Sequence, residues 1–184
     1  MDRGRERLLG REQVYRGRAV GLRVDTVEKP SGRRTTREIV EHGDCVAVVA
    51  LEGENVLLVR QFRHAVGLSL LEVPAGGINP GEEPEDCVRR ELREETGYLP
   101  QKVEGLGGFY SAPGYCTEYL HLYLATDLIP SPLQAEDTED IELVRVPITD
   151  IPTLITSGEI QDAKSIAGLS WVLPNSGIGP AHKE

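Results

Sequence analysis

The chain has 184 residues, which suits one domain with a small appendage, and 39% of them are hydrophobic, enough for a core. Its formal net charge of −10 argues against nonspecific binding to nucleic acid or to an anionic membrane. Three cysteines at unrelated spacings predict neither a disulfide framework nor a zinc site. The sequence shows no apolar run long enough to span a membrane and no signal peptide, so a cytoplasmic location is the simplest prediction.

The first 42 residues predict a small β-region. Residues 1–12 are charged, and residues 13–42 place apolar side chains among polar neighbours, which predicts two or three antiparallel strands. Because a sheet of this size buries little surface by itself, it should pack on its own domain or on a second subunit. We therefore expect an N-terminal β-strand region over 1–42, a main domain over 43–174 and a flexible tail over 175–184.

The main domain reads as strands with a few helices. A continuous apolar run and its return strand are joined by a hairpin turn, and a third strand leads into a glycine-rich loop. Strands with few helices favour an α/β fold with a mixed sheet and helices on both faces. The predicted strands are 45–51, 56–62, 68–73, 103–110, 119–125 and 141–146, and the predicted helices after the loop's own helix are 150–157 and 162–173.

The residues 75–98 form the stretch around which the chain is organised. Its glycines and Pro80 predict a rigid, tight loop. Pro84 suits the first turn of a helix, where its missing N–H costs nothing, and Gly97 suits the position just past a helix end. We therefore predict a helix over 84–96.

One face of this helix is acidic. At about 100° per residue, Glu91, Glu94 and Glu95 fall within one arc, with Val88 and Leu92 on the edge that should meet the core. Carboxylates at this spacing repel one another and weaken a helix unless a partner offsets the charge. Oxygen ligands of this density suit Mg²⁺ or Mn²⁺. The alternative is an exposed acidic face that is paired with arginine or simply solvated.

The spacing of the loop and the helix resembles a known family. Gly76, then Glu82 after five residues, then Arg90 after seven more, followed by ELREETGY, match the Nudix box at every fixed position. Tyr98 stands where the box usually holds an aliphatic residue. The resemblance to Nudix hydrolases implies an α/β/α sandwich with a mixed sheet. It also implies metal-assisted hydrolysis of a nucleoside diphosphate linked to another moiety.

Three flanking stretches resemble the ADP-ribose pyrophosphatase branch of this family. They are VRQFRHAVG at 59–67, LEVPAG at 71–76 and YSAPGYCTE at 110–118. The branch implies cleavage of ADP-ribose to AMP and ribose 5-phosphate, and a homodimer whose N-terminal strands help to form the partner's substrate site. Alternatives are another substrate (a sugar nucleotide such as GDP-mannose, NADH or a damaged nucleoside triphosphate) and a module that binds ADP-ribose without hydrolysing it.

The resemblance also implies metal-site roles around the box. Glu91 and Glu95 are the expected metal ligands, with Glu94 as a third, direct or through water. The backbone carbonyl of Ala75 is an expected ligand as well. Two further expected members of the site are Glu82, reaching a metal through water, and Arg90, orienting the loop and helix carboxylates.

The general base of this branch comes from a loop beyond the box. Here that loop is 131–140, SPLQAEDTED, and its position before a strand favours Glu139, with Glu136 second. The alternative is that this acidic run is only a solvated loop.

Two arginines at the end of a strand suit a diphosphate, because a guanidinium binds two oxygens at once. They are Arg60 and Arg63, and the alternative for them is an ion pair with Glu72 or Glu118. Glu72 is expected to pair with one of them or with a substrate hydroxyl.

The two ends of the substrate have separate candidates. The resemblance places Ser111 and Gly114 around the terminal ribose, with help from Glu118. For adenine the candidates lie on the N-terminal strands and are Arg23, Val24 and Tyr15. Tyr15 could equally be an aromatic residue of the core.

Overall fold

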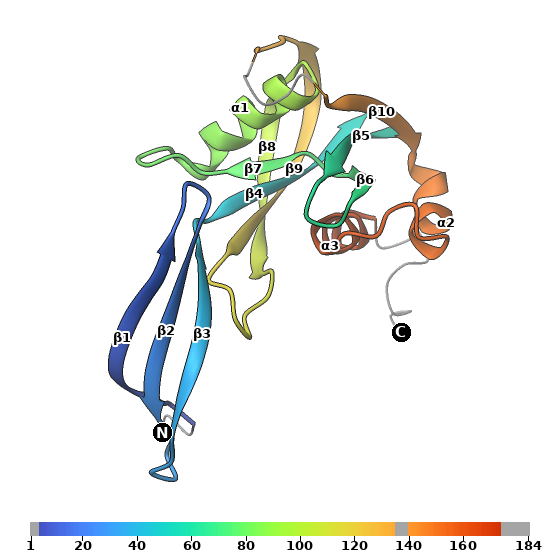
Figure 1. Ribbon diagram of the computed structural model, residues 1–184. Helices are drawn as coiled ribbons and strands as arrows, with labels where there is room; N and C mark the ends of the chain where they lie inside the picture. Colours follow the sequence, from blue (N-terminus) through green and yellow to red (C-terminus); the bar gives the residue numbers. More distant parts are fainter. Residues whose placement is uncertain (1–3, 135–139, 174–184) are drawn as a thin grey trace. The chain divides into compact units, whose positions relative to one another are not determined.

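The computed structural model describes residues 4–134 and 140–173 (Figure 1). The chain divides into two compact units. The first contains residues Met1–Asp44 and Tyr110–Tyr119, and the second contains Cys45–Phe109 and Leu120–Glu184. A segment from the middle of the sequence therefore belongs to the same unit as the N-terminal strands.

The first unit is built on a three-stranded antiparallel sheet in the order β1-β2-β3. The prediction that the first strand starts near residue 13 was wrong, because β1 begins at Arg7. Its charged residues pair across the strands: Arg7 lies 2.6 Å from Glu28, and Arg11 lies 3.0 Å from Asp25. The strands are β1 (Arg7–Arg16), β2 (Val20–Glu28) and β3 (Arg34–His42).

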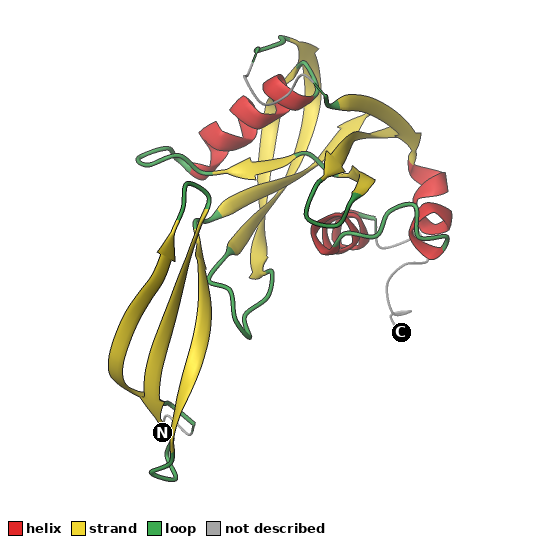
Figure 2. Cartoon of the chain, in the orientation of Figure 1, coloured by secondary structure: helices red, strands yellow, loops and turns green. Residues whose placement is uncertain are grey.

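The second unit contains a mixed sheet, as the sequence predicts (Figure 2). Its order is β10-β5-β4-β9-β8, with β6 also paired to β5 and β7 to β4. The β4–β9 pair is parallel, whereas β5 runs antiparallel to β4, β6 and β10. The strands are β4 (Cys45–Glu52), β5 (Asn55–Arg63), β6 (Leu68–Glu72), β7 (Ala75–Gly77), β8 (Tyr98–Tyr110), β9 (Tyr119–Pro130) and β10 (Glu142–Pro147).

Helices cover both faces of this sheet, which confirms the predicted α/β/α sandwich (Figure 2). Alternate side chains of β4 point to opposite faces. Val46 and Val48 pack in the cluster that holds the buried residues of α1, and Ala47 and Val49 pack in the cluster that holds those of α2 and α3. The helices are α1 (Pro84–Glu95), α2 (Ile151–Thr156) and α3 (Ala163–Val172), with a short 3₁₀ helix (Ile148–Asp150) before α2.

Several elements of the second unit differ from the sequence prediction. Strand β9 continues to Pro130 rather than ending at residue 125. Strand β8 begins at Tyr98 rather than at residue 103, because Gly97 at φ 79° turns the chain from α1 directly into the strand. The glycine-rich stretch read as pure loop contains β7, whose backbone pairs with residues 45–47. Within the described residues, no helix is both long and apolar enough to cross a membrane.

Candidate active site

The position of α1 is fixed by its apolar side. Cys87, Val88 and Leu92 are completely buried against the sheet, as predicted for the last two. Pro84 starts the helix, and the N–H of Thr96 donates to the carbonyl of Leu92 at its end. Because the core packing of these residues fixes the rotation of α1 about its axis, it also fixes the direction in which the acidic face points.

The strand β7 brings backbone against this acidic face. The N–H of Ala75 donates to Glu95 Oε2 at 3.2 Å. A Cβ added at Gly76 would lie well inside 3.0 Å of the Glu91 carboxyl group. The glycine is therefore required by the close approach of a side chain rather than by its own backbone conformation.

Arg90 connects the loop to the helix. Its Nε and Nη2 donate to the two carboxylate oxygens of Glu82 at 2.8 and 2.9 Å. Its Nη1 donates to Glu91 Oε1 at 2.6 Å and to Glu94 Oε2 at 3.1 Å, and its Nη2 also reaches the carbonyl of Gly77 at 3.0 Å. One guanidinium thus contacts three of the carboxylates that the sequence singles out.

The carboxylates of the site have unlike pKa values. The hydrogen bond from Arg90 lowers the pKa of Glu82 to about 2. Burial raises the pKa of Glu91, although Arg90 opposes the shift. Burial, together with the charge of Glu91, raises the pKa of Glu95 to about 8. Glu95 is therefore the carboxylate of this group that is most costly to ionise in the protein alone.

The residues present fit a hard divalent cation. The donors on this face are carboxylate oxygens, and Mg²⁺ and Mn²⁺ prefer oxygen ligands. In the described part of the chain, no lysine or arginine forms an ion pair with Glu95, whereas Glu82, Glu91 and Glu94 all contact Arg90. A desolvated carboxylate without a paired cation, beside two others on one helix face, is the arrangement that a bound cation would complete.

A second charged group surrounds Glu72, which is 2% exposed. Arg63 Nη2 lies 2.5 Å and Lys164 Nζ 2.8 Å from Glu72 Oε2, so Arg63 has the partner that the sequence offered as an alternative. Lys164 also contacts Asp162 at 2.9 Å. Lys164 was missed because it lies 92 residues from Glu72 in the sequence, and its position at a helix start carries no signal of this contact.

Replacing Glu72 by glutamine should lower the free energy of unfolding at pH 7 by about 2–3 kcal/mol, because two cations lose their buried partner. Burial alone would raise the pKa of Glu72, but Arg63 and Lys164 hold it below its usual 4.5. The difference from wild type should therefore be complete above pH 4.5 and shrink as the pH falls through the lowered pKa. Urea unfolding at several pH values measures it.

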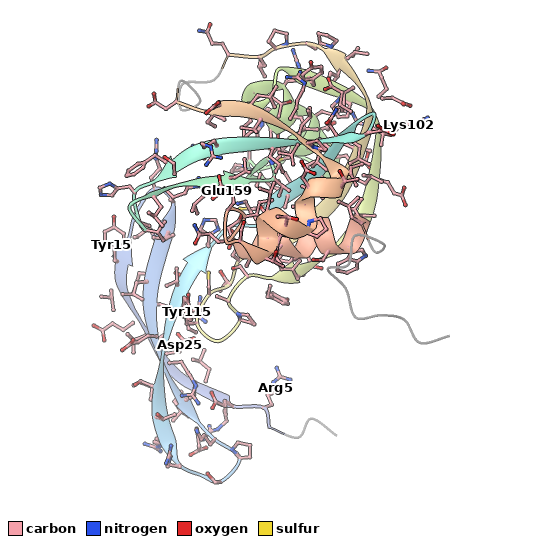
Figure 3. The ribbon with its side chains drawn as sticks, turned by 90° about the vertical axis from the view of Figure 1, so that its right-hand side faces the viewer. Arg5, Tyr15, Asp25, Lys102, Tyr115 and Glu159 are labelled. Carbon is pink, nitrogen blue, oxygen red and sulfur yellow. The ribbon has the colours of Figure 1, made fainter. Side chains whose placement is uncertain are left out.

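The matched control is Glu159→Gln. Glu159, labelled in Figure 3, lies between α2 and α3 and pairs with the partly exposed Arg60 at 2.6 Å. Neither partner offered by the sequence for Arg60 is the one observed. Because exposed ion pairs contribute little, this variant should stay within about 0.5 kcal/mol of wild type. Equal losses in the two variants would contradict the buried role of Glu72.

The remaining substrate candidates lie in the first unit, together with the N-terminal strands. The N–H of Ser111 donates to the carbonyl of Glu118 at 3.3 Å, which closes the loop that contains Gly114. Glu118 Oε1 lies 3.5 Å from His42 Nδ1.

Two candidates for adenine have different surroundings in this sheet. The guanidinium of Arg23 contacts Asp25 and Glu41. Tyr15 is 57% exposed, which excludes the alternative of a core aromatic within this unit (Figure 3). Val24 is partly buried in β2. The candidates for the base, Glu139 and Glu136, lie outside the described residues.

Comparisons with known proteins identify relatives of this chain. A family model described as the NUDIX domain matches residues 41–169. The chain is 36% identical over 170 residues to an ADP-ribose pyrophosphatase of Bacillus subtilis (strain 168), covering 91% of this chain and 92% of the relative. It is 33% identical over 154 residues to a GDP-mannose pyrophosphatase of Citrobacter koseri, covering 78% of this chain and 80% of that relative.

The fold is shared as well. A crystal structure of an ADP compounds hydrolase matches with a TM-score of 0.85 at 24% identity, covering 95% of this chain and 97% of the other. The region matched by the family model spans most of the chain and includes α1, its acidic face and the strand β7 beside it. The chain therefore belongs to the Nudix hydrolase family.

Proposed function

We propose that this protein hydrolyses the diphosphate of ADP-ribose to AMP and ribose 5-phosphate with Mg²⁺ as its metal, Mn²⁺ being a possible substitute. The observation that carries the proposal is the acidic face of α1, where Glu95 is desolvated and forms no ion pair within the described residues, and where Gly76 lets β7 approach Glu91. Nudix enzymes generally use divalent metal ions, and the carboxylate oxygens of this face are donors that suit one.

The metal would be held by Glu91 and Glu95, with Glu94 as a third ligand, the carbonyl of Ala75 as a fourth, and Glu82 through water. When bound, such a cation neutralises phosphate charge and lowers the pKa of a water molecule. Arg90 would keep the loop and helix carboxylates in place through the contacts described above.

The chain's own cations would bind the diphosphate. Arg63 donates to Glu72 through Nε and Nη2, so its Nη1 edge remains available for phosphate oxygens. Arg60 would join it by exchanging its exposed contact with Glu159 for the substrate. Glu72 would then act as the anchor of Arg63. Proton abstraction from the attacking water is assigned to Glu139.

Other parts of the chain would hold the two ends of the substrate. Ser111, Gly114 and Glu118 would surround the terminal ribose, and Arg23 would lie at the adenine. We also propose a cytoplasmic homodimer in which the N-terminal β-region, residues 1–42, contributes to dimerisation and to the adenine site. Residues 43–174 would form the hydrolase domain and residues 175–184 a flexible tail.

The choice of ADP-ribose over GDP-mannose as the substrate rests on sequence similarity to relatives. The ADP-ribose pyrophosphatase of Bacillus subtilis is more similar and matches a larger share of the chain than the GDP-mannose pyrophosphatase of Citrobacter koseri. The second candidate function is therefore hydrolysis of a sugar nucleotide by the same site.

The two functions are separated by a substrate panel of ADP-ribose, GDP-mannose, NADH, diadenosine polyphosphates and 8-oxo-dGTP, each with Mg²⁺ and with chelator. We expect AMP release from ADP-ribose that the chelator abolishes, with kcat/KM at least about tenfold above that for GDP-mannose. A higher kcat/KM for another member would keep the chemistry and reject the substrate. Binding of ADP-ribose without AMP release would reject the hydrolase.

A further inference from the structure

The segment 110–119 is hydrogen-bonded to the edge of β3 that does not pair with β2. The N–H of Val40 donates to the carbonyl of Tyr115 at 2.7 Å, and the N–H of Thr117 donates to the carbonyl of Val40 at 3.0 Å. These two bonds extend the N-terminal sheet by a short parallel bridge between Val40 and Cys116.

The hydroxyl of Thr117 continues this attachment beyond the bridge. It accepts the N–H of His42 at 2.9 Å and donates to the carbonyl of the same residue at 3.0 Å. One side chain therefore satisfies both backbone groups of His42, as a neighbouring strand would. Thr117 is itself exposed, so packing does not explain its position.

The attachment places the proposed contacts for both substrate ends in one compact unit. Arg23 contacts Glu41, which precedes His42 in β3. His42 is bonded to Thr117, which directly precedes Glu118 in the loop. The base of the loop is closed by the bond from Ser111 to Glu118. A continuous series of contacts thus connects Arg23 on the sheet to Glu118 on the loop.

We propose that Thr117 is a positioning residue for substrate binding, which fixes Glu118 relative to Arg23 by bonding the loop to β3. The inference rests on the proposed function, in that the ligand is a nucleoside diphosphate whose two ends meet these residues. Thr117 does not touch the substrate. Its loss should weaken substrate binding and leave the hydrolytic step, carried by the second unit's α1, largely unchanged.

The test compares Thr117→Val, which removes the hydroxyl and keeps the shape, with Thr117→Ser, which keeps the hydroxyl. The matched control is Thr149→Val, because the Thr149 hydroxyl donates at 3.3 Å to the adjacent Asp150. We expect Thr117→Val to raise KM about tenfold with kcat within about twofold, and the other two variants to stay near wild type. KM is measured with whichever panel member the wild type hydrolyses best, so a wrong choice of ADP-ribose does not affect this test.

Amide hydrogen exchange supplies a readout that needs no substrate. Exchange of the His42 amide should be about tenfold faster in Thr117→Val than in wild type, and the serine variant should restore protection. An unchanged KM, equal increases of KM in the valine and serine variants, or unchanged exchange at His42 would overturn the proposal. If the wild type hydrolyses no panel member, the proposed function fails separately, and the exchange result still decides whether Thr117 holds the loop.

Discussion

Replacing Glu95 by glutamine is expected to lower kcat for nucleoside diphosphate hydrolysis by about two to three orders of magnitude at saturating Mg²⁺. The side chain keeps its size and its contact with the N–H of Ala75, but it loses the charge that a cation needs. Steady-state kinetics over a range of Mg²⁺ concentrations measures the effect. The control is Glu85→Gln, an exposed carboxylate in the first turn of the same helix, which should leave kcat unchanged.

Although Glu95→Gln should lower kcat, it should raise the stability of the metal-free protein at neutral and higher pH. Because the pKa of Glu95 is raised from 4.5 to about 8, the folded state holds this proton more tightly than the unfolded chain. The stability that the protonated carboxyl contributes is complete below pH 4.5 and is lost as the pH rises through about 8. In chelator, Glu95→Gln should therefore become more stable than wild type as the pH rises. Near-normal kcat in the variant would reject the metal role of this helix face.

Replacing Gly76 by alanine is expected to reduce kcat/KM at least about a hundredfold, because catalytic groups displaced by an ångström lose about this much. The added Cβ would overlap the Glu91 carboxyl group, which is held on its other side by Arg90 and by the burial of α1. Either β7 or Glu91 must then move. The measurement is the steady-state rate of hydrolysis, with thermal unfolding as a check that the variant is folded.

The neighbouring Gly77 provides a matched control. A Cβ added there meets nothing within 4 Å, so Gly77→Ala should keep most of the activity. Equal losses in the two variants would show that any alanine in β7 is harmful, and would contradict the specific approach of Gly76 to Glu91.

Local signals in the sequence were enough to predict α1 and the direction of its acidic face. Pro84 and Gly97 mark the helix ends within a residue, and the spacing of Val88 and Leu92 identifies the buried side. The continuous apolar run of β4 likewise predicts a strand buried on both faces, which the two core clusters confirm. These features are encoded within a few residues of one another, so the chain's periodicity reveals them.

The features that sequence reasoning missed depend on distant partners. The hydroxyl of Thr117 bonds the backbone of His42, 75 residues away, and Lys164 contacts Glu72 across 92 residues. Strand β7 has no side-chain pattern because two of its three residues are glycine. The early start of β1 was hidden because its charged residues form cross-strand ion pairs, whereas a charged run alone indicates a solvated segment.

The most direct measurement of the metal site is a calorimetric titration of the metal-free protein with Mg²⁺ at pH 7, in two buffers that differ in ionisation enthalpy. Since the pKa of Glu95 is about 8 without metal, its carboxyl group is mostly protonated at this pH and must ionise to become a ligand. We predict release of close to one proton by the wild type and close to none by Glu95→Gln. Equal proton release by the wild type and by Glu95→Gln would contradict the assignment of Glu95 as a metal ligand.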